Sequence, residues 1–510
     1  MRRCGILMPI SALPSPYGIG TLGAEARNFA DFLAAGGQSC WQLLPVGPTS
    51  YGDSPYQSFS SFAGNPYFID LDLLAADGLL EPSEFQNLDW GGDRSRVDYG
   101  LLYQNRYPVL RRACARLLAQ NRPDFAVFCR EQADWLEDYA LFMALKEAHG
   151  GASWFQWPEE LRLRRPAALE RAREDLAGET AFWKAVQYLF FCQWDALKSY
   201  ANGLGVSIIG DLPIYAAGDS ADVWAAPEQF QLDEKGLPIE VAGCPPDDFA
   251  QDGQLWGTPL FDWERMKEEG YAWWLRRIAF QFRLYDTLRI DHFRGFDSYY
   301  AIPYGEATAR NGRWRPGPGI DFFRTVNRVL GKKDVIAEDL GFLTPSVRKL
   351  LRDSGYPGMK VLECAFDSRD TGSGYLPHCY PANCVAYTGT HDNDTVQGWM
   401  ATAPKKDVAY AKAYLRLSAR EGYHWGMIRS ILGSPAGLAV IQFQDLLGLG
   451  SEARMNTPST LGNNWRWRTL PGSFDEKLSR RLFRETRVYQ RLAVQAENTK
   501  NEDVDSHASE

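Results

Sequence analysis

Eight short apolar segments, each followed by polar residues or by glycine and proline, constrain the fold of this chain most strongly. Helical patterns separate several of them. Strands that alternate with helices are typical of a parallel sheet, and eight such strands predict an α/β fold, a closed (β/α)8 barrel of the TIM type. An open doubly wound sheet is the alternative, but no G-x-G-x-x-G motif follows the first segment. The segments are GILMPIS, SCWQLLPVGP, VSIIGDLPIYA, TLRIDHFRGF, DVIAEDLG, GMKVLECAF, NCVAYTGTHDND and LAVIQFQDLLG.

Two long intervals interrupt this alternation and define the predicted domain organisation. Residues 1–73 hold the first two strands, and residues 74–200 have the pattern of a mostly helical subdomain inserted into the barrel. Residues 201–496 complete the barrel. Within them, residues 217–274 are rich in glycine, proline and tryptophan, and an interval this long is usually functional, so we predict an active-site lid. Residues 497–510 are acidic, lack apolar anchors and are predicted to be disordered.

The composition of the chain argues against several classes of protein. The net charge of the 510 residues is -9, and no basic patch or zinc-finger spacing is present, so nucleic acid is not an expected partner. No apolar run approaches the roughly 18 residues of a membrane span, and the first residues are typical of a strand rather than a signal peptide. Nine scattered cysteines indicate a reducing cytoplasm. The 17 tryptophans fit either a large core or carbohydrate binding.

Carboxylates stand at the C-terminal ends of four predicted strands: Asp211, Asp291, Glu338 and Asp392. In a TIM barrel these ends form one mouth, where active sites lie. Retaining glycoside chemistry requires two facing carboxylates, a nucleophile and an acid/base. Arg289 projects to the same side of its strand as Asp291 and favours the ionised form that a nucleophile needs. Glu338 ends the apolar run VIAE and faces negative charge, which favours the protonated form that a general acid needs.

Two simpler interpretations compete with catalysis. One acidic residue at one strand end is more often a cap or part of an ion pair, but four at the same mouth favour an active site. His391 beside Asp392 raises the alternative of a metal centre. No second histidine lies at a ligand spacing such as H-x-x-x-H, so we predict that no metal is bound.

Seven stretches of the chain resemble the amylomaltases, or 4-α-glucanotransferases, which are glycoside hydrolase family 77 of the α-amylase clan. They extend from near the N-terminus to about residue 468, so the resemblance covers nearly the whole chain. The tryptophan-containing loop and the Asn-Trp-x-Trp segment make it specific, because general α-amylases lack both. The stretches are DSPYQSFSSFAGNPYFID, GDLPIYAAGDSADVWAAPEQF, AGCPPDDFAQDGQLWGTPLFDW, LRIDHFRGF, VIAEDLG, YTGTHDNDT and RMNTPSTLGNNWRWR.

The resemblance implies a (β/α)8 barrel with helical insertions and no separate C-terminal β-domain. It implies Asp291 as nucleophile, Glu338 as acid/base, and Asp392 as a third carboxylate that binds hydroxyls of the sugar in subsite −1. It also implies α-1,4-glucans as donor and acceptor, no organic cofactor and generally no metal. The predicted substrate-binding residues are Tyr56, Asp211, Arg289 and His391 around subsite −1, and Asp247, Trp256 and Tyr51 on the acceptor side.

The carboxylates alone do not separate a transferase from a hydrolase, because Asp291 and Glu338 would serve both. Transfer is favoured when the acceptor is well bound and water is excluded. The loop AGCPPDDFAQDGQLWGTPLF can supply an acceptor platform and a lid, although Tyr51 and Trp256 could equally be core residues. We therefore predict a 4-α-glucanotransferase. An α-1,4-glucan hydrolase is the alternative, and a catalytically silent glucan-binding scaffold is a third possibility.

Overall fold

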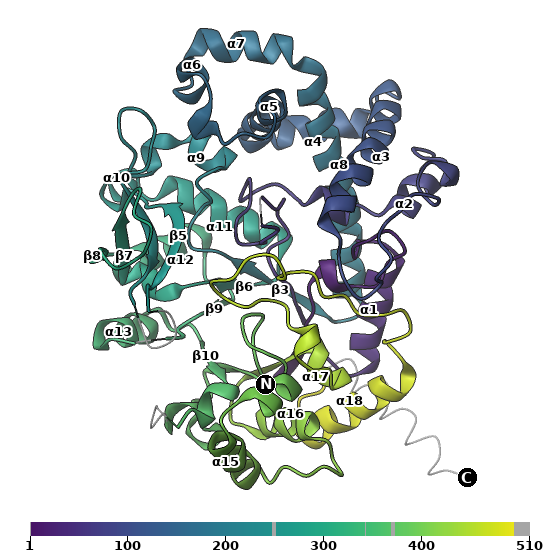
Figure 1. Cartoon of the computed structure of the whole chain (residues 1–510), viewed down its shortest axis with the longest axis vertical. Coiled ribbons are helices and arrows are strands. Elements are labelled where there is room, and N and C mark those ends of the chain that lie inside the picture. Colours follow the sequence, from purple (N-terminus) through teal and green to yellow (C-terminus); the bar gives the residue numbers. More distant parts are fainter. Residues whose placement is uncertain (1, 51, 247–250, 342, 369–372, 494–510) are drawn as a thin grey trace.

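Eight parallel strands close into a barrel in the computed structural model, as the sequence predicts (Figure 1). The structure describes residues 2–493, except residues 51, 247–250, 342 and 369–372. Each barrel strand pairs with the next one along the chain, and the first pairs with the last to close the ring. The barrel strands are β1 (Arg3–Leu7), β2 (Cys40–Gln42), β3 (Ser207–Leu212), β6 (Thr287–Ile290), β9 (Val335–Ala337), β10 (Gly358–Val361), β11 (Cys384–Tyr387) and β12 (Leu438–Gln442).

Each predicted segment coincides with one barrel strand, although β1 begins at Arg3, two residues before the predicted segment GILMPIS. The strands are short and almost wholly buried, because side chains fill the inside of the barrel and helices cover its outside. No strand follows β12 in the described part of the chain. The register aligns Asp211 of β3 with Arg289 of β6, so these two side chains lie on the same side of neighbouring strands.

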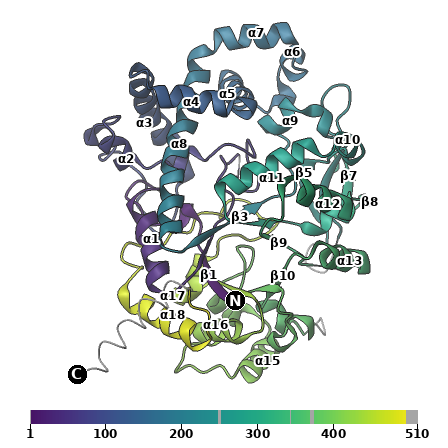
Figure 2. The same cartoon turned by 180° about the vertical axis from the view of Figure 1, so that it is seen from behind.

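Helices cover the barrel and extend it at both ends (Figure 1 and Figure 2). Helices α4 to α7 gather at one end of the molecule, and α15, α16 and α18 lie at the other. No described helix is both long and apolar enough to cross a membrane. The helices are α1 (Ala24–Ala35), α2 (Leu71–Ala76), α3 (Tyr99–Ala119), α4 (Pro123–Glu131), α5 (Ala133–Ala148), α6 (Glu159–Arg162), α7 (Pro166–Asp175), α8 (Ala177–Gly203), α9 (Ala221–Ala225), α10 (Trp263–Glu268), α11 (Ala272–Leu284), α12 (Gly319–Leu330), α13 (Pro345–Ser354), α14 (Val396–Thr402), α15 (Lys405–Leu415), α16 (Tyr423–Gly433), α17 (Phe443–Leu447) and α18 (Glu476–Val488).

The interval between β2 and β3 is helical, with α3 to α7 inside residues 74–200 and α8 continuing past residue 200 to Gly203. The interval 217–274 holds α9 and α10 and the strands β4 (Glu240–Cys244) and β5 (Gln254–Pro259). These strands join β7 (Ser298–Pro303) and β8 (Arg313–Pro316) in an antiparallel sheet of order β5-β4-β7-β8. This small sheet was not predicted, because its strands are short and rich in glycine and proline. The domain boundaries themselves stay a prediction.

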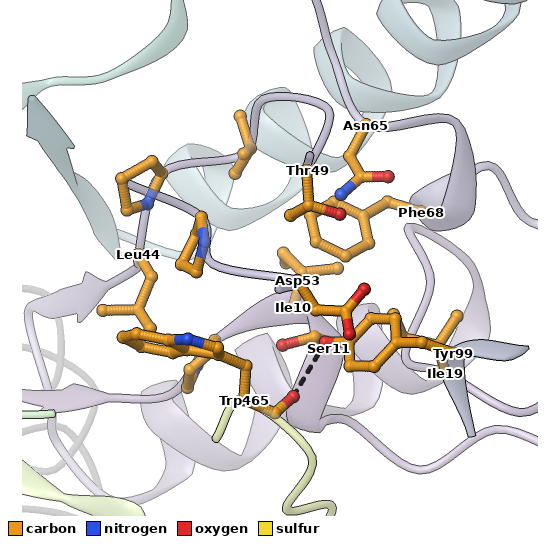
Figure 3. A pocket seen from close by; sticks show the side chains of 14 residues that line it. Ile10, Ser11, Ile19, Leu44, Thr49, Asp53, Asn65, Phe68, Tyr99 and Trp465 are labelled. Atoms are coloured by element: carbon orange, nitrogen blue, oxygen red, sulfur yellow. Dashed lines mark hydrogen bonds between the residues drawn. The ribbon is translucent and has the colours of Figure 1, made fainter. Parts of the chain in front are cut away.

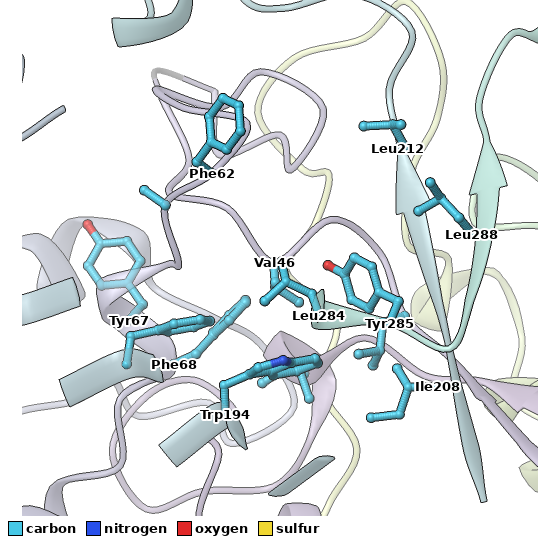
Figure 4. Close-up of a cluster of buried hydrophobic side chains, with 14 of the residues drawn as sticks. Val46, Phe62, Tyr67, Phe68, Trp194, Ile208, Leu212, Leu284, Tyr285 and Leu288 are labelled. Atoms are coloured by element: carbon cyan, nitrogen blue, oxygen red, sulfur yellow. The ribbon is translucent and has the colours of Figure 1, made fainter. Parts of the chain in front are cut away.

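Aromatic side chains pack directly against the backbone of the barrel strands. Figure 4 shows one such cluster, in which Trp194 of α8 and Tyr285 lie near Ile208 of β3. A Cβ atom at Gly210 would lie only 2.0 Å from a ring carbon of Tyr285. A glycine is therefore required there, and the close contact fixes the strand that carries Asp211.

Candidate active site

The carboxyl ends of the barrel strands open into a cavity of about 750 Å³. Of the ten side chains that the sequence predicts for the site, Asp211 lies beneath this cavity, and Tyr51 and Asp247 lie outside the described residues. The other seven line the cavity together: Tyr56, Trp256, Arg289, Asp291, Glu338, His391 and Asp392.

Arg289 joins two aspartates in a buried ion-pair network. Its Nη1 donates to both carboxylate oxygens of Asp211 at 2.7 Å, and its Nη2 lies 3.0 Å from Oδ1 of Asp291. The side chains of Asp211 and Arg289 are 0% and 3% exposed, whereas that of Asp291 is 29% exposed. Asp291 follows the last residue of β6, yet it lies on the side of the strand that the sequence predicts. The network therefore presents the Asp291 carboxylate to the cavity and buries the other two charged groups beneath it.

Tyr56 and His391 extend this network from two other segments. The Tyr56 hydroxyl donates to Oδ2 of Asp211 at 2.8 Å and lies 3.3 Å from Nδ1 of His391. The two rings are stacked, with centroids 4.9 Å apart. Burial raises the pKa of Tyr56 well above its usual value, so the phenol stays neutral and presents a ring face with a fixed hydroxyl.

Glu338 directly follows β9, and its carboxylate accepts two backbone hydrogen bonds. The N–H groups of His292 and Leu340 donate to its two oxygens, each at 2.7 Å. Burial, followed by the charge of Asp291, raises the pKa of Glu338 to about 7. Arg289 and the two N–H donors act in the opposite direction and lower this pKa, but their effect is smaller. A carboxyl group that titrates near neutrality can both give and accept a proton in one catalytic cycle.

His292 shapes the site through its backbone. Its φ angle of 51° is in the left-handed region, which non-glycine residues rarely occupy and which is common at functional sites. This conformation accompanies the donation of the His292 N–H to Glu338. Burial lowers the pKa of the His292 imidazole to about 4, so the ring is neutral at pH 7. The sequence analysis gives His292 no role, because a backbone donor leaves no signal in residue type.

Trp256 of β5 lies against this corner of the cavity. Its ring centroid is 4.8 Å from that of His292, at an interplanar angle of 88°. Its Nε1 donates to Oε1 of Gln254 at 3.1 Å, which fixes the orientation of the indole. The small antiparallel sheet therefore places the Trp256 ring beside His292, the residue that follows Asp291.

Asp392 is held differently, by a segment far away in the sequence. It lies in the loop after β11, and its side chain is 48% exposed. Asn456 Nδ2 donates to its Oδ1 at 2.6 Å, and His391 Nε2 lies 3.4 Å from its Oδ2. Arg454 bridges the backbone of the two segments, because it donates to the carbonyls of Asp392 and Asn456 at 2.7 and 2.8 Å. The sequence analysis missed Asn456 and Arg454 individually, although both lie in the stretch RMNTPSTLGNNWRWR.

Trp465, from the same stretch, completes the wall of the cavity. Its ring centroid is 5.8 Å from that of Tyr56 and 5.9 Å from that of His391. Figure 3 shows a small pocket behind it, of about 30 Å³, where the Tyr99 hydroxyl donates to the Trp465 carbonyl at 2.8 Å. This anchor fixes the segment that also supplies Asn456.

The cavity contains carboxylates and a histidine, which are residue types that can bind metal ions. Among the described residues, no three His, Cys, Asp or Glu side chains gather as a group that could hold a metal ion. The absence of a cofactor stays a prediction.

The fold and this mouth together define a TIM-barrel site with paired carboxylates, the arrangement suited to chemistry on glycosidic bonds. The chain belongs to the 4-alpha-glucanotransferase family, glycoside hydrolase family 77, whose model matches residues 8–472.

Named relatives agree with this family. A 4-alpha-glucanotransferase of Clostridium butyricum is 47% identical, over 95% of this chain and 100% of its own. The Thermus thermophilus 4-alpha-glucanotransferase is 49% identical over 94% of this chain and 97% of its own. An amylomaltase of Streptococcus agalactiae, solved in complex with acarbose, superposes with a TM-score of 0.94 at 40% identity, covering 96% of this chain and 100% of its own.

Proposed function

We propose that this chain is a 4-α-glucanotransferase, which moves a segment of an α-1,4-glucan onto the 4-hydroxyl of another glucan or of glucose. The observation that carries the proposal is the meeting of Asp291, Glu338 and the Arg289 ion pairs in one cavity. Family membership supplies the substrate class.

In the first step, a carboxylate oxygen of Asp291 attacks the anomeric carbon of the donor sugar. The bond from this carbon to the oxygen of the leaving glucan breaks, and Glu338 gives that oxygen its proton. The pKa of about 7 leaves Glu338 largely protonated below neutrality, as this step requires. The product is a glycosyl ester of Asp291.

In the second step, the 4-hydroxyl oxygen of the acceptor attacks the same carbon. Glu338 accepts the hydroxyl proton, the ester bond breaks, and Asp291 leaves as a carboxylate. Two inversions at one carbon retain its configuration. Each step regenerates the protonation state that the other needs.

The remaining polar residues hold the sugar in subsite −1. Asp392 binds its hydroxyls and favours its distorted, oxocarbenium-like form, and Tyr56 stacks on its ring. Arg289, Asp211 and His391 fix these groups. Asn456 holds the carboxylate of Asp392 through the hydrogen bond to Oδ1.

The acceptor binds on the side of the cavity formed by the small sheet. Trp256 supplies a ring face and screens water from the glycosyl ester. We also propose acceptor binding for Asp247 and Tyr51, which lie outside the described residues. Transfer then exceeds hydrolysis because the acceptor is held where water would otherwise attack.

We also infer a reducing compartment, the cytoplasm. All nine cysteines lie in the described part of the chain, and none of them forms a disulfide there.

Incubation with maltotriose, followed by separation of the products by size, tests the function. A transferase yields glucose together with oligomers longer than maltotriose, and the number of reducing ends stays constant. A Glu338→Gln control must leave maltotriose unchanged. Maltose and glucose as the only products, with rising reducing ends, would mean a hydrolase.

A further inference from the structure

The outer face of the small sheet carries an exposed apolar patch. In the described part of the chain, twelve large hydrophobic side chains are exposed, and four of them belong to this one small sheet and its strand ends. They are Ile239 (56% exposed), Leu255 (39%), Tyr304 (48%) and Trp314 (43%). Exposed apolar side chains that gather in this way mark interaction sites more often than isolated ones do.

The strand register explains why these side chains share one face. Leu255 of β5 is opposite Gly243 of β4, Gly243 is opposite Tyr300 of β7, and Tyr300 is opposite Trp314 of β8. Residues directly opposite one another point to the same side of a sheet. Leu255 and Trp314 are therefore the two ends of one row, three strand spacings or roughly 14 Å apart.

The row begins at the edge of the active-site cavity. Leu255 and Ala309 both line that cavity. The Tyr300 hydroxyl donates a hydrogen bond to the Ala309 carbonyl at 3.1 Å. The Tyr300 ring packs with Ala309, Val241 and Ile302 in a hydrophobic cluster that is separate from the main core. Tyr300 and its neighbours are themselves buried, so the row joins the rim of the cavity to Trp314 through a packed layer that lies between the exposed side chains.

Trp314 at the far end of the row is held in a fixed orientation. The guanidinium of Arg294 lies 4.1 Å from the centroid of its ring, and the Tyr300 ring meets it at 5.3 Å and 65°. Arg294 lies in the short 3-10 turn η6 (Phe293–Phe296), three residues after Asp291. An exposed ring that is already immobilised loses little conformational entropy when a ligand stacks on it.

We propose that this face binds the part of a long α-1,4-glucan that extends out of the cavity, with Trp314 as the stacking platform. The inference rests on the proposed function. A pyranose ring presents an apolar face of C–H groups that suits an aromatic ring, and its hydroxyls stay in water at the edges. A glucan is favoured over a second copy of this chain, because the patch starts at the cavity that would hold the same glucan.

The test compares a short and a long substrate in the full-length protein. Trp314 does not line the cavity, so Trp314→Ala should leave kcat/KM for maltotriose within about twofold of the wild type. For amylose it should raise KM at least about fivefold, the lower end of measured aromatic stacking effects. Trp314→Phe, which retains a ring, should recover most of this loss. Tyr410→Ala on α15 is a matched control, because Tyr410 is 47% exposed and lies at a different end of the molecule.

Retention of the inert variant Glu338→Gln in a gel that contains amylose gives a second measurement, free of turnover. Addition of Trp314→Ala should weaken this retention. Equal losses on maltotriose and amylose, no loss on amylose, or a dimer that Trp314→Ala dissociates would each overturn the inference. If the wild type does not elongate maltotriose, the proposed transferase function is wrong. If it elongates maltotriose but Trp314→Ala has no effect on amylose, only the inference about Trp314 is wrong.

Discussion

Two groups of residues in the active site are held in place by different means. Asp211, Arg289, Asp291 and Glu338 lie in the barrel strands or one residue past them, and the backbone of the barrel fixes their positions. Asp392, in the loop after β11, and Trp256, in the interval between β3 and β6, form the second group, which we call the excursion-held group because both lie outside the barrel strands. Side-chain hydrogen bonds orient these two side chains. The side chain of Asp211 is 0% exposed, whereas that of Asp392 is 48% exposed.

This difference separates two tasks. In the proposed mechanism, the strand-held group (Asp211, Arg289, Asp291 and Glu338) forms and breaks the glycosyl ester, which requires a fixed distance and a fixed charge pattern. In the same mechanism, the excursion-held group distorts the sugar and selects the acceptor. We therefore expect changes in the first group to affect both folding and cleavage, and changes in the second to affect catalysis with little change in stability.

The largest contrast is expected in stability, between Asp211→Asn and Asp392→Asn. Asp211→Asn leaves Arg289 buried with one counter-ion fewer, which should cost about 3 kcal/mol of the free energy of unfolding. Asp392→Asn changes a half-exposed group and should cost less than about 0.5 kcal/mol. The midpoints of denaturation of the two variants test this. Equal denaturation midpoints for Asp211→Asn and Asp392→Asn would contradict the proposed difference in stability between the strand-held and the excursion-held residues.

The next effect concerns catalysis and the hydrogen bond from Asn456 to Asp392. Asn456→Ala removes a hydrogen bond to a charged group, worth about 1.5–3 kcal/mol, and should lower kcat/KM about 10- to 150-fold. Asn456→Asp should be worse, because it places a like charge beside Asp392. Denaturation midpoints close to that of the wild type would show that the loss is catalytic. If Asn456→Ala keeps more than half of the wild-type kcat/KM, contacts other than the Asn456 hydrogen bond must fix the position of Asp392.

Trp256→Ala should shift the choice of acceptor more than it slows cleavage. Loss of a stacking contact weakens acceptor binding by about 1–3 kcal/mol, so water competes better for the glycosyl ester. The measurement is the ratio of reducing ends created to oligomers elongated at fixed maltotriose, with Trp256→Phe as the control that keeps a ring. An unchanged ratio with a uniformly lower rate would assign Trp256 to support of the cavity wall alone.

The smallest expected effect is the pH dependence of kcat/KM, which should change by about tenfold per pH unit because the pKa of Glu338 is about 7. The first step needs Glu338 protonated, and the protonated fraction is full below that pKa and falls as the pH rises through it. We expect kcat/KM for maltotriose to fall above about pH 7. A profile that stays flat to pH 9 would contradict the assignment of Glu338 as the acid.

The strand-held group is also the part of the site that the sequence predicts best. The alternation of strands and helices identifies all eight barrel strands, and the rules for barrels bring Asp211, Arg289, Asp291 and Glu338 to one mouth. The period of two residues along a strand predicts the ion pair between Arg289 and Asp291, which the structure confirms.

The excursion-held group depends on contacts that no local pattern encodes. Asn456 contacts Asp392 across 64 residues of sequence, and β4 pairs with β7 in a sheet whose strands are drawn from two separate intervals of the chain. Such contacts depend on long-range packing, and only the family resemblance pointed to the stretch that contains Asn456 and Trp465.

Direct trapping of the glycosyl ester tests the central claim, that Asp291 carries the glucan between donor and acceptor. Glu338→Gln cannot protonate a glucan leaving group, but an α-maltotriosyl fluoride needs little protonation and should still load the nucleophile. Trypsin then releases residues 290–294, IDHFR, in which Asp291 is the one side-chain carboxylate. We predict a maltotriosyl adduct on this peptide by mass spectrometry, and none when Asp291→Asn is added. An adduct on another peptide would contradict the account.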